Sequence, residues 1–481
     1  MSKIIFIEPK APNLHIFSKF PLPRLGTILL GTIARDEGWD AAVIVEERKE
    51  IDWDEIATAD IVGISTITST APRAFAIADR VQKLGIPVIL GGPHVSFLPD
   101  EALEHSDFLI RGEAEGVFPL FLETLKNNGD FSVVPNLSFK KNQTVIHNKI
   151  TAEPTDMNML PYPEFSIIQG KPKRIGGKYI IPVQTSRGCP YNCSFCSVTG
   201  MFGRKYRFRS VEHIIGELRR YNDGKNFVFF YDDNFGANRK RLIDLLDAMI
   251  AENFKFKWST QVRADITKDE ELIKKMRKSG CHTVFIGFES VNPASLKAMN
   301  KCQSVEGMEH AAQVFKRNKI NVHGMFVVGV DDDNPDSVKA SVKFAKRNWL
   351  SSVQFLILTP LPGTRCYNDL CKAGRITFKD WSLYDAHHVV FKPIKFSLAD
   401  LQKAQMKAHE QFYSLYESIR RLMHFRFVDV GIAHYARHLN FSWRRKNKMF
   451  LKLLDLLKPR KGARIIADYE QEIALDTNST H

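Results

Sequence analysis

Three of the seven cysteines in this 481-residue chain lie close together, at Cys189, Cys193 and Cys196, in the spacing C-x3-C-x2-C. Three thiolates on one short loop can each bind one iron of a [4Fe–4S] cluster, which is usually held by four cysteines. The fourth iron would then be open to a small molecule. A zinc site is less consistent with the spacing, because structural zinc usually pairs two such units and no second pair lies nearby. We therefore predict an iron–sulfur loop rather than a zinc site or buried thiols.

The loop resembles the signature of the radical S-adenosylmethionine (SAM) superfamily, which is C-x3-C-x2-C with an aromatic residue, here Phe195, before the last cysteine. The resemblance implies that Cys189, Cys193 and Cys196 bind the cluster and that SAM chelates the open iron. It also implies that reduction of the cluster cleaves SAM to a 5′-deoxyadenosyl radical. No catalytic residue beyond the cluster ligands is assigned.

Residues 181–392 alternate predicted strands and helices, with strands at 180–185, 227–231, 257–261, 283–288, 322–328 and 353–358. Six such strands predict a partial (β/α)6 barrel whose site lies at their carboxyl ends. Resemblance to the radical SAM core implies that SAM is bound by Asp232, Asp233, Arg263, Glu289, Ser290, Gly324 and Gly329. The acidic pair could instead cap a helix, and the glycines could relieve strand crowding. Arg207 and Arg209 could pair with a carboxylate or phosphate.

Residues 1–130 also alternate strands, at 3–8, 41–45, 60–65, 86–90 and 108–110, with helices. Short apolar strands separated by helices predict a parallel, Rossmann-like (flavodoxin-like) sheet that binds its ligand beyond the strand ends. The pattern resembles the cobalamin-binding domain that precedes many radical SAM domains. The resemblance places cobalamin at the strand-end residues Ser65, Thr66, Gly91, Gly92, Gly112 and Glu113. The alternative is a domain that only packs.

One departure concerns the lower ligand of cobalt. Many cobalamin domains carry D-x-H-x-x-G after the first strand, whereas this chain has Asn13-Leu-His15-Ile-Phe-Ser18, which lacks both the Asp and the Gly. His15 is therefore a weak candidate for a cobalt ligand, since an ordinary loop histidine needs no special explanation. Members without the motif can still bind the corrin.

Residues 131–180 are predicted to be a linker with a small hairpin at 136–146, and 393–481 a helical, basic C-terminal domain. We expect helices at 398–423 and 443–457, with a break near 429–431. Residues 437–464 hold ten Lys or Arg and one acid, interleaved with apolar residues. This pattern favours peripheral contact with an anionic membrane. A packed helix with a charged face remains an alternative, and nucleic-acid binding is less favoured.

Composition indicates a cytoplasmic globular protein. An odd number of cysteines fits reduced thiols better than a disulfide framework, and no signal-peptide core or apolar run of membrane-spanning length is present. The pairs Cys366/Cys371 and His387/His388 are weak candidates for further metal sites, because a second cluster needs four ligands and adjacent histidines usually point apart.

Residues 3–392 together resemble the cobalamin-binding radical SAM branch that includes anaerobic Mg-protoporphyrin ester cyclase, bacteriochlorophyll side-chain methylases and hopanoid methylases. The resemblance implies C-methylation of an unactivated carbon by the deoxyadenosyl radical and methylcobalamin, with a flavodoxin- or ferredoxin-type electron donor. A hydrophobic acceptor is expected, either a tetrapyrrole side chain or an isoprenoid lipid. The alternatives are ring formation without methyl transfer and a corrinoid or cluster sensor. Radical methylthiolation of tRNA would require three further N-terminal cysteines, and residues 1–188 contain none.

Overall fold

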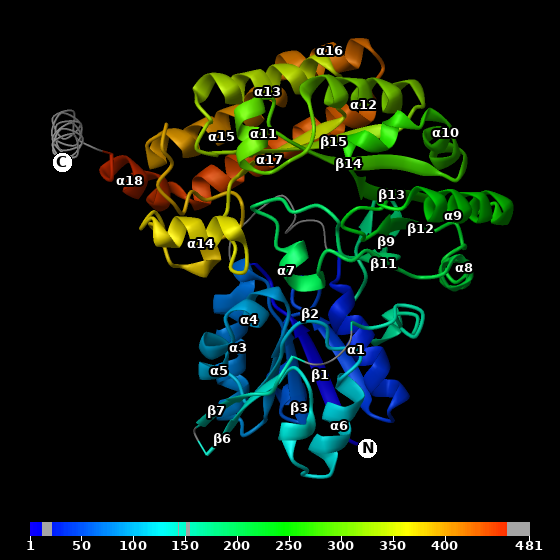
Figure 1. The fold of residues 1–481 in the computed structure, drawn as a ribbon, viewed down its shortest axis with the longest axis vertical. Helices are drawn as coiled ribbons and strands as arrows, with labels where there is room; N and C mark the ends of the chain where they lie inside the picture. Colours follow the sequence, from blue (N-terminus) through cyan, green and yellow to red (C-terminus); the bar gives the residue numbers. More distant parts are fainter. Residues whose placement is uncertain (12–21, 143, 151–153, 459–481) are drawn as a thin grey trace, which may run out of the picture.

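The chain forms two seven-stranded sheets, one in each half of the sequence, in a computed structural model that describes residues 1–481 except 12–21, 143, 151–153 and 459–481. Figure 1 shows the N-terminal sheet, in blue and cyan, at one end of the molecule and the second sheet, largely in green, toward the other. The short helix α7 (Val198–Phe202) lies between these two bodies.

The N-terminal sheet confirms the predicted Rossmann-like arrangement. Its strands follow the order β2-β1-β3-β4-β5-β6-β7, and the first five are parallel. The strands are β1 (Lys3–Glu8), β2 (Asp40–Val45), β3 (Ile61–Ser65), β4 (Val88–Gly91), β5 (Phe108–Ile110), β6 (Leu137–Lys141) and β7 (Thr144–His147). The predicted hairpin is present as β6 and β7, and it forms an antiparallel edge of this sheet. The sheet therefore extends past residue 130.

Helices cover both faces of this sheet, as a parallel sheet requires. One apolar core lies under α1 and α6, and a second lies under α3 and α5. The helices are α1 (Leu25–Asp36), α2 (Trp53–Ile56), α3 (Ala71–Lys83), α4 (Pro93–Phe97), α5 (Pro99–Glu104) and α6 (Phe118–Lys126).

The second sheet contains the six predicted parallel strands in the order β16-β15-β14-β13-β12-β9, with β8 antiparallel at the edge. It curls into a half-barrel. The strands are β8 (Arg174–Ile175), β9 (Lys178–Val183), β12 (Asn226–Phe230), β13 (Lys257–Val262), β14 (Cys281–Glu289), β15 (Asn321–Val328) and β16 (Ser352–Ile357). A two-stranded ribbon, β10 (Ser186–Arg187) and β11 (Arg207–Phe208), flanks the cysteine loop.

Local sequence signals explain where the barrel helices begin. Asn238, Asp269, Ser304 and Asn334 each accept a hydrogen bond from a backbone N–H in the first turn of the following helix, which satisfies donors that have no partner within a helix. The helices are α8 (Val211–Arg219), α9 (Arg239–Glu252), α10 (Glu270–Lys278), α11 (Pro293–Ala298), α12 (Val305–Arg317), α13 (Pro335–Arg347) and α14 (Arg365–Lys372).

The C-terminal region is helical as predicted, but the breaks lie elsewhere. The helices are α15 (Leu398–Phe412), α16 (Leu415–Met423), α17 (Phe427–Lys446) and α18 (Lys448–Leu456). The expected break near 429–431 is wrong, because α17 continues through Gly431. Asp429 is buried there in ion pairs with Arg421 and Arg426, which fix the first turn of α17. The chain turns instead at Phe425, whose φ is 57°.

None of the helices in the described part of the chain combines the length and the apolar composition of a membrane span.

Helix α15 completes the open edge of the half-barrel at β16. The Tyr413 hydroxyl donates to the Val353 carbonyl and accepts from the Val353 N–H, both at 2.8 Å. His409 Nε2 accepts from the Phe355 N–H, and Gln405 donates to the Phe355 carbonyl. Burial lowers the pKa of His409 to about 3, which keeps this ring nitrogen unprotonated and able to accept. No further strand pairs with this edge of β16 in the described sheet. Three side chains instead satisfy backbone N–H and carbonyl groups of β16 that would otherwise be unpaired.

We predict that Tyr413→Phe destabilises the protein by about 1–3 kcal/mol, because it leaves a buried backbone N–H and carbonyl unpaired without changing ring packing. Urea unfolding measures the effect. Tyr416→Phe is the matched control, since Tyr416 is 72% exposed. This variant should unfold at the same urea concentration as the unmodified protein. Equal unfolding midpoints for both variants would contradict the role of Tyr413 at this edge.

Candidate active site between the two sheets

The cysteine loop begins directly after β9 and is positioned by Asp232. This carboxylate is fully buried and accepts hydrogen bonds from the Thr185 backbone N–H and hydroxyl, both at 3.0 Å, and from the Ser186 hydroxyl. Its oxygens therefore hold the segment that leads into the loop. The role expected for Asp232 at SAM stays a prediction, and the structure shows a bracing role.

A clamp of three side chains holds the outer part of the loop. The Arg263 guanidinium lies 3.6 Å above the Tyr191 ring, and the Tyr191 hydroxyl donates to Asp265 at 3.0 Å. Arg263 also donates to the Cys302 carbonyl at 2.9 Å. The expected contact of Arg263 with SAM stays a prediction. In the structure its guanidinium stacks on Tyr191 and supports the loop. Tyr191 lies inside the cysteine motif and was not identified from the sequence.

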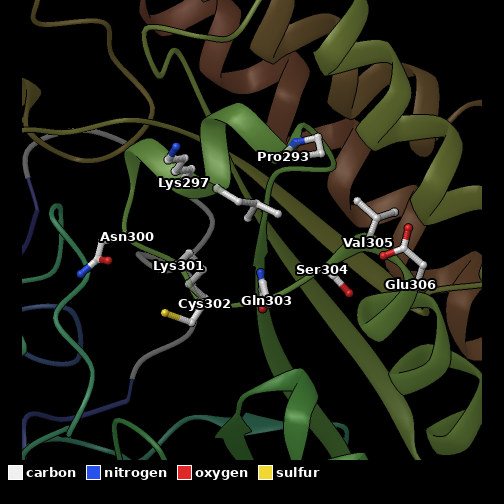
Figure 2. A pocket seen from close by; sticks show the side chains of 10 residues that line it. Pro293, Lys297, Asn300, Lys301, Cys302, Gln303, Ser304, Val305 and Glu306 are labelled. Atoms are coloured by element: carbon white, nitrogen blue, oxygen red, sulfur yellow. The ribbon is translucent and has the colours of Figure 1, made fainter.

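The segment from Met299 to Cys302 forms the floor beneath the loop. The Ser194 N–H donates to the Met299 carbonyl at 3.1 Å, and the Asn300 side chain donates to the Asn192 carbonyl at 2.7 Å. Figure 2 shows Asn300, Lys301 and Cys302 along one side of a pocket of about 500 Å³. Its lining continues through Gln303 and Ser304 to the start of α12. The loop and this pocket therefore share one support.

The three cysteines are half-buried free thiols. Burial raises the pKa of Cys196 to about 12, and the charges of Cys193, Asp233 and Cys189 add to the rise. Over the described ranges, no group of three His, Cys, Asp or Glu side chains converges on a single-ion site. In a cubane cluster each cysteine binds a different iron. Three grouped thiols on one loop fit that donor set.

Asp233 is the second carboxyl of the predicted acidic pair. Burial and the neighbouring Asp232 raise the pKa of Asp233 to about 7, and the charge of Arg187 opposes the rise. Its charge in turn acts on Cys196. Of the two adjacent acids, Asp232 is held by Thr185 and Ser186, and Asp233 is the one whose charge raises the pKa of Cys196.

Glu289 ends β14 in a left-handed conformation with a φ of 62° and accepts a 2.7 Å hydrogen bond from Lys301 Nζ. Both side chains are about nine-tenths buried. A Cβ at position 287 would lie 2.3 Å from the Glu289 carboxylate and 3.0 Å from the Lys301 ammonium, so a side chain there would displace this buried pair. The sequence showed Gly287 only as an isolated glycine inside a strand, a signal of close approach. Ser290 accepts from the Asn292 N–H and shapes the turn.

The two glycines predicted to contact SAM have packing roles. A Cβ on Gly324 would meet Leu350, Phe288 and Phe326, which belong to the core between the sheet and its helices. Gly329 has a φ of 97°, and a Cβ there would lie 2.7 Å from Leu401. Their assignment to SAM stays a prediction.

At the mouth of the N-terminal sheet, small residues leave an open cradle. A Cβ on Gly91 or Gly112 would meet open space, whereas one on Gly92, whose φ is 104°, would lie 2.5 Å from the Thr66 carbonyl. The Thr66 hydroxyl is buried and has no hydrogen-bond partner among the described residues. The Ser65 carbonyl accepts from Arg24 at 2.9 Å. An open cradle with an unpaired hydroxyl fits a large ligand such as cobalamin. His15 lies outside the described residues.

Glu113, which was expected at cobalamin, joins the two halves of the molecule. Arg187, from the segment that enters the cysteine loop, donates to Glu113 at 2.8 Å and also to Glu115. Arg207 pairs with both oxygens of Glu113, which confirms that it binds a carboxylate; Arg209 pairs with Glu217. Burial raises the pKa of Glu115, but the charge and hydrogen bond of Arg187 outweigh it, so this pKa lies below its usual value.

The weaker metal candidates have structural partners. His388 Nδ1 contacts Asp385 at 2.9 Å, and its Nε2 contacts Asn447 at 2.9 Å. The Cys366 N–H donates to the Ser194 carbonyl, so this residue supports the cysteine loop through its backbone. Cys371 is exposed.

Comparison with known proteins gives matches over both halves. Residues 183–345 match the radical SAM superfamily, and residues 18–122 match the B12 binding domain. An uncharacterized methyltransferase of Pyrococcus horikoshii is 30% identical over 81% of this chain and 88% of its own length. The bacteriochlorophyllide d C-8(2)-methyltransferase of Chlorobaculum tepidum is 29% identical over 83% of this chain and 89% of its own length.

A solved structure shares the fold. The cobalamin-dependent SAM radical enzyme OxsB, with aqua-cobalamin bound, aligns with a TM-score of 0.70 at 18% identity. The alignment covers 98% of this chain and 75% of that one.

We predict that Arg187→Met destabilises the protein by about 3–5 kcal/mol, since it leaves the buried Glu115 carboxylate without its cation and removes one of the two cations that pair with Glu113. Chemical denaturation measures the change. The control is Arg219→Met, which removes an exposed pair with Glu252 and should leave the unfolding curve unchanged. If both variants unfolded alike, the ion pairs of Arg187 between the two halves would contribute no more to the stability of the protein than an exposed ion pair does.

The matched segments coincide with the two halves of the site. The B12-binding match contains the glycine cradle, and the radical SAM match contains the three cysteines, Asp233 and Glu289. The buried Arg187 pairs connect these halves. The chain belongs to the cobalamin-binding radical SAM enzymes, in the branch of the cobalamin-dependent methyltransferases.

Proposed function

We propose that this enzyme methylates an unactivated carbon of a hydrophobic acceptor, most readily a tetrapyrrole side chain and otherwise an isoprenoid lipid. The observation that carries the proposal is the Arg187 ion-pair network, which joins the loop bearing Glu113 to the strand that enters the cysteine loop. Two cofactor sites tied in this way can hold one substrate carbon between them, in the near-attack geometry that the reaction needs.

Within this proposal, each half of the site has a defined task. Cys189, Cys193 and Cys196 hold the cluster, and the carboxyls of Asp233 and Glu289 contact SAM. Ser65, Thr66, Gly91, Gly92 and Gly112 form the cradle for the corrin. When bound, the cluster with SAM supplies a radical that removes a hydrogen atom, and the corrin supplies a methyl group. The protein positions the reactants and excludes water.

Phe97 contributes to water exclusion where the two halves meet. It belongs to α4 of the N-terminal domain and packs against two glycines of the other half: a Cβ on Gly363 would lie 2.4 Å from its ring, and one on Gly200 would lie 3.0 Å from it. Because any larger residue at these glycines would displace the ring, the contact is close.

The concave face of the half-barrel supports an apolar acceptor. The Phe229 ring contacts those of Tyr231 and Phe285, with ring centroids 6.2 and 5.6 Å apart. Their neighbours Phe230 and Trp258 belong to the helix-covered core on the other face. A relative acts on bacteriochlorophyllide d, which favours the tetrapyrrole. An external electron donor of flavodoxin or ferredoxin type is part of the proposal.

Peripheral contact with an anionic membrane through 437–464 is also part of the proposal. In the described portion of this stretch, Phe441, Met449 and Leu456 are 67%, 75% and 82% exposed. Basic residues flank them on α17 and α18.

We predict that replacing Cys189, Cys193 or Cys196 with Ala abolishes iron binding and SAM cleavage, because a cubane cluster needs a thiolate on each protein-bound iron. Iron and sulfide content, and 5′-deoxyadenosine after reduction, are measured in anaerobically reconstituted protein. The control Cys371→Ala removes an exposed thiol and should keep both properties. Full SAM cleavage by a loop variant would exclude the cluster assignment.

We predict that reaction with a bacteriochlorophyllide forms equal amounts of S-adenosylhomocysteine and 5′-deoxyadenosine, since the proposed methylation would consume one SAM as the source of the methyl group and another as the source of the radical. Both products are quantified by mass spectrometry, after a corrin absorption band has been verified in the purified protein. 5′-Deoxyadenosine with a new ring and no S-adenosylhomocysteine would indicate a cyclase. Absence of SAM cleavage in reduced, fully loaded protein would indicate a sensor.

A further inference from the structure

Helix α16 has its polarity reversed relative to an ordinary surface helix. The side chains it buries are Glu417, Ser418 and Arg421. The side chains it exposes are Leu415, Tyr416, Ile419, Leu422 and Met423, which are between 47% and 72% exposed. A surface helix normally turns its apolar stripe to the core. The apolar face of α16 is therefore available for a partner.

The apolar surface continues around the turn into α17. Phe425 at the turn is 80% exposed, and Phe427 and Val428 in the first turn of α17 are 62% and 71% exposed. With the exposed side chains of α16 they form one cluster, which we call the 415–428 tip. Contiguous exposed apolar side chains on this scale mark an interaction site.

The exposed charged side chains within residues 414–446 are basic, and one of them, Arg444, pairs with the exposed Glu410 of α15. Residues 414–446 contain seven Lys or Arg and two acids, Glu417 and Asp429. Both acids are buried, at 5% and 6% exposure. Glu417 pairs with Arg420 and Lys346, and Asp429 pairs with Arg421 and Arg426. The exposed surface of this segment thus combines apolar and basic groups and presents no carboxylate.

An aromatic and cationic cluster borders the tip. The Trp349 ring has the Arg420 guanidinium at 4.1 Å, the Lys316 ammonium at 5.6 Å and the His424 ring at 4.7 Å. His424 immediately precedes Phe425. Tryptophan is common at the boundary between water and the hydrocarbon of a bilayer, because its ring is apolar and its N–H is polar. Trp349, with cations around it and an apolar surface beside it, fits that environment.

The position of the tip is compatible with a membrane contact that leaves the site accessible. Figure 1 shows α16 at the end of the molecule opposite the N-terminal sheet. The two halves of the candidate active site face each other between the two sheets. A surface bound to α16 would not cover the junction at which the Arg187 network lies.

We propose that the 415–428 tip enters the interfacial layer of an anionic lipid bilayer and is the main membrane contact of this enzyme. The inference rests on the peripheral membrane contact of the proposed function and assigns its main part to the α16–α17 turn, with 437–464 as the weaker part. Apolar side chains give the insertion, and the excess of cations over exposed acids gives the preference for anionic lipid.

The test is co-sedimentation of the full chain with vesicles of phosphatidylcholine and phosphatidylglycerol. The tip variant Met423→Ser/Phe425→Ser/Phe427→Ser should bind at least about tenfold more weakly, because three large apolar side chains no longer enter the lipid. The matched control Phe441→Ser/Met449→Ser/Leu456→Ser removes three comparably exposed apolar side chains from α17 and α18 and should lose much less binding than the tip variant does. The unmodified chain and both variants should each bind less to vesicles of phosphatidylcholine alone than to vesicles that also contain phosphatidylglycerol.

The remaining outcomes overturn the inference in distinguishable ways. If only the control variant lost binding, the contact would lie at 437–464 and the tip would have no role. If the unmodified chain did not bind anionic vesicles, the membrane contact of the proposed function would fail as well. A chain that is dimeric without lipid and becomes monomeric in the tip variant would identify the tip as a self-association face. Circular dichroism verifies folding, and SAM cleavage in solution tests the enzyme separately.

Discussion

The ion pairs of Arg187 with Glu113 and Glu115 are the interaction on which the site depends. Arg187 is only 4% exposed, and taking a guanidinium and two carboxylates out of water is costly unless they meet in good geometry. The interaction therefore specifies one arrangement of the two halves. Since Glu113 follows β5 and Arg187 follows β9, the mouths of both sheets are fixed to each other by the same side chains.

A second constraint acts through the short segment from Met299 to Cys302. Its backbone carbonyls accept from Ser194 and Arg263, and its Lys301 holds the carboxylate of Glu289. The cysteine loop and the end of β14 are therefore positioned by one piece of chain. Gly287 is part of this arrangement, because any side chain there would occupy the space of the Glu289–Lys301 pair. Movement of this segment would displace both sides of the proposed SAM site together.

The first structural role of the C-terminal helices is to complete the half-barrel. A half-barrel leaves backbone groups of β16 without a neighbouring strand, and α15 satisfies them through Tyr413, His409 and Gln405. Helix α16 continues from α15 but buries its charged side chains and exposes its apolar ones. The same segment of chain thus completes the fold on one side and presents an apolar surface on the other.

The sequence by itself determined the chemistry and the order of the elements. The spacing of Cys189, Cys193 and Cys196, the strand–helix alternation and the glycines at strand ends are local patterns, and local patterns are visible in a single chain. Tertiary structure alone decided which residues share a task. Asp232 and Asp233 are neighbours in sequence, yet the first accepts hydrogen bonds from Thr185 and Ser186, whereas the charge of the second acts on Cys196. Glu113 was visible as a strand-end carboxylate, but its arginine partners lie far along the chain. The reversed polarity of α16 was likewise hidden, because periodicity indicates that a helix has two faces and only packing decides which face is covered.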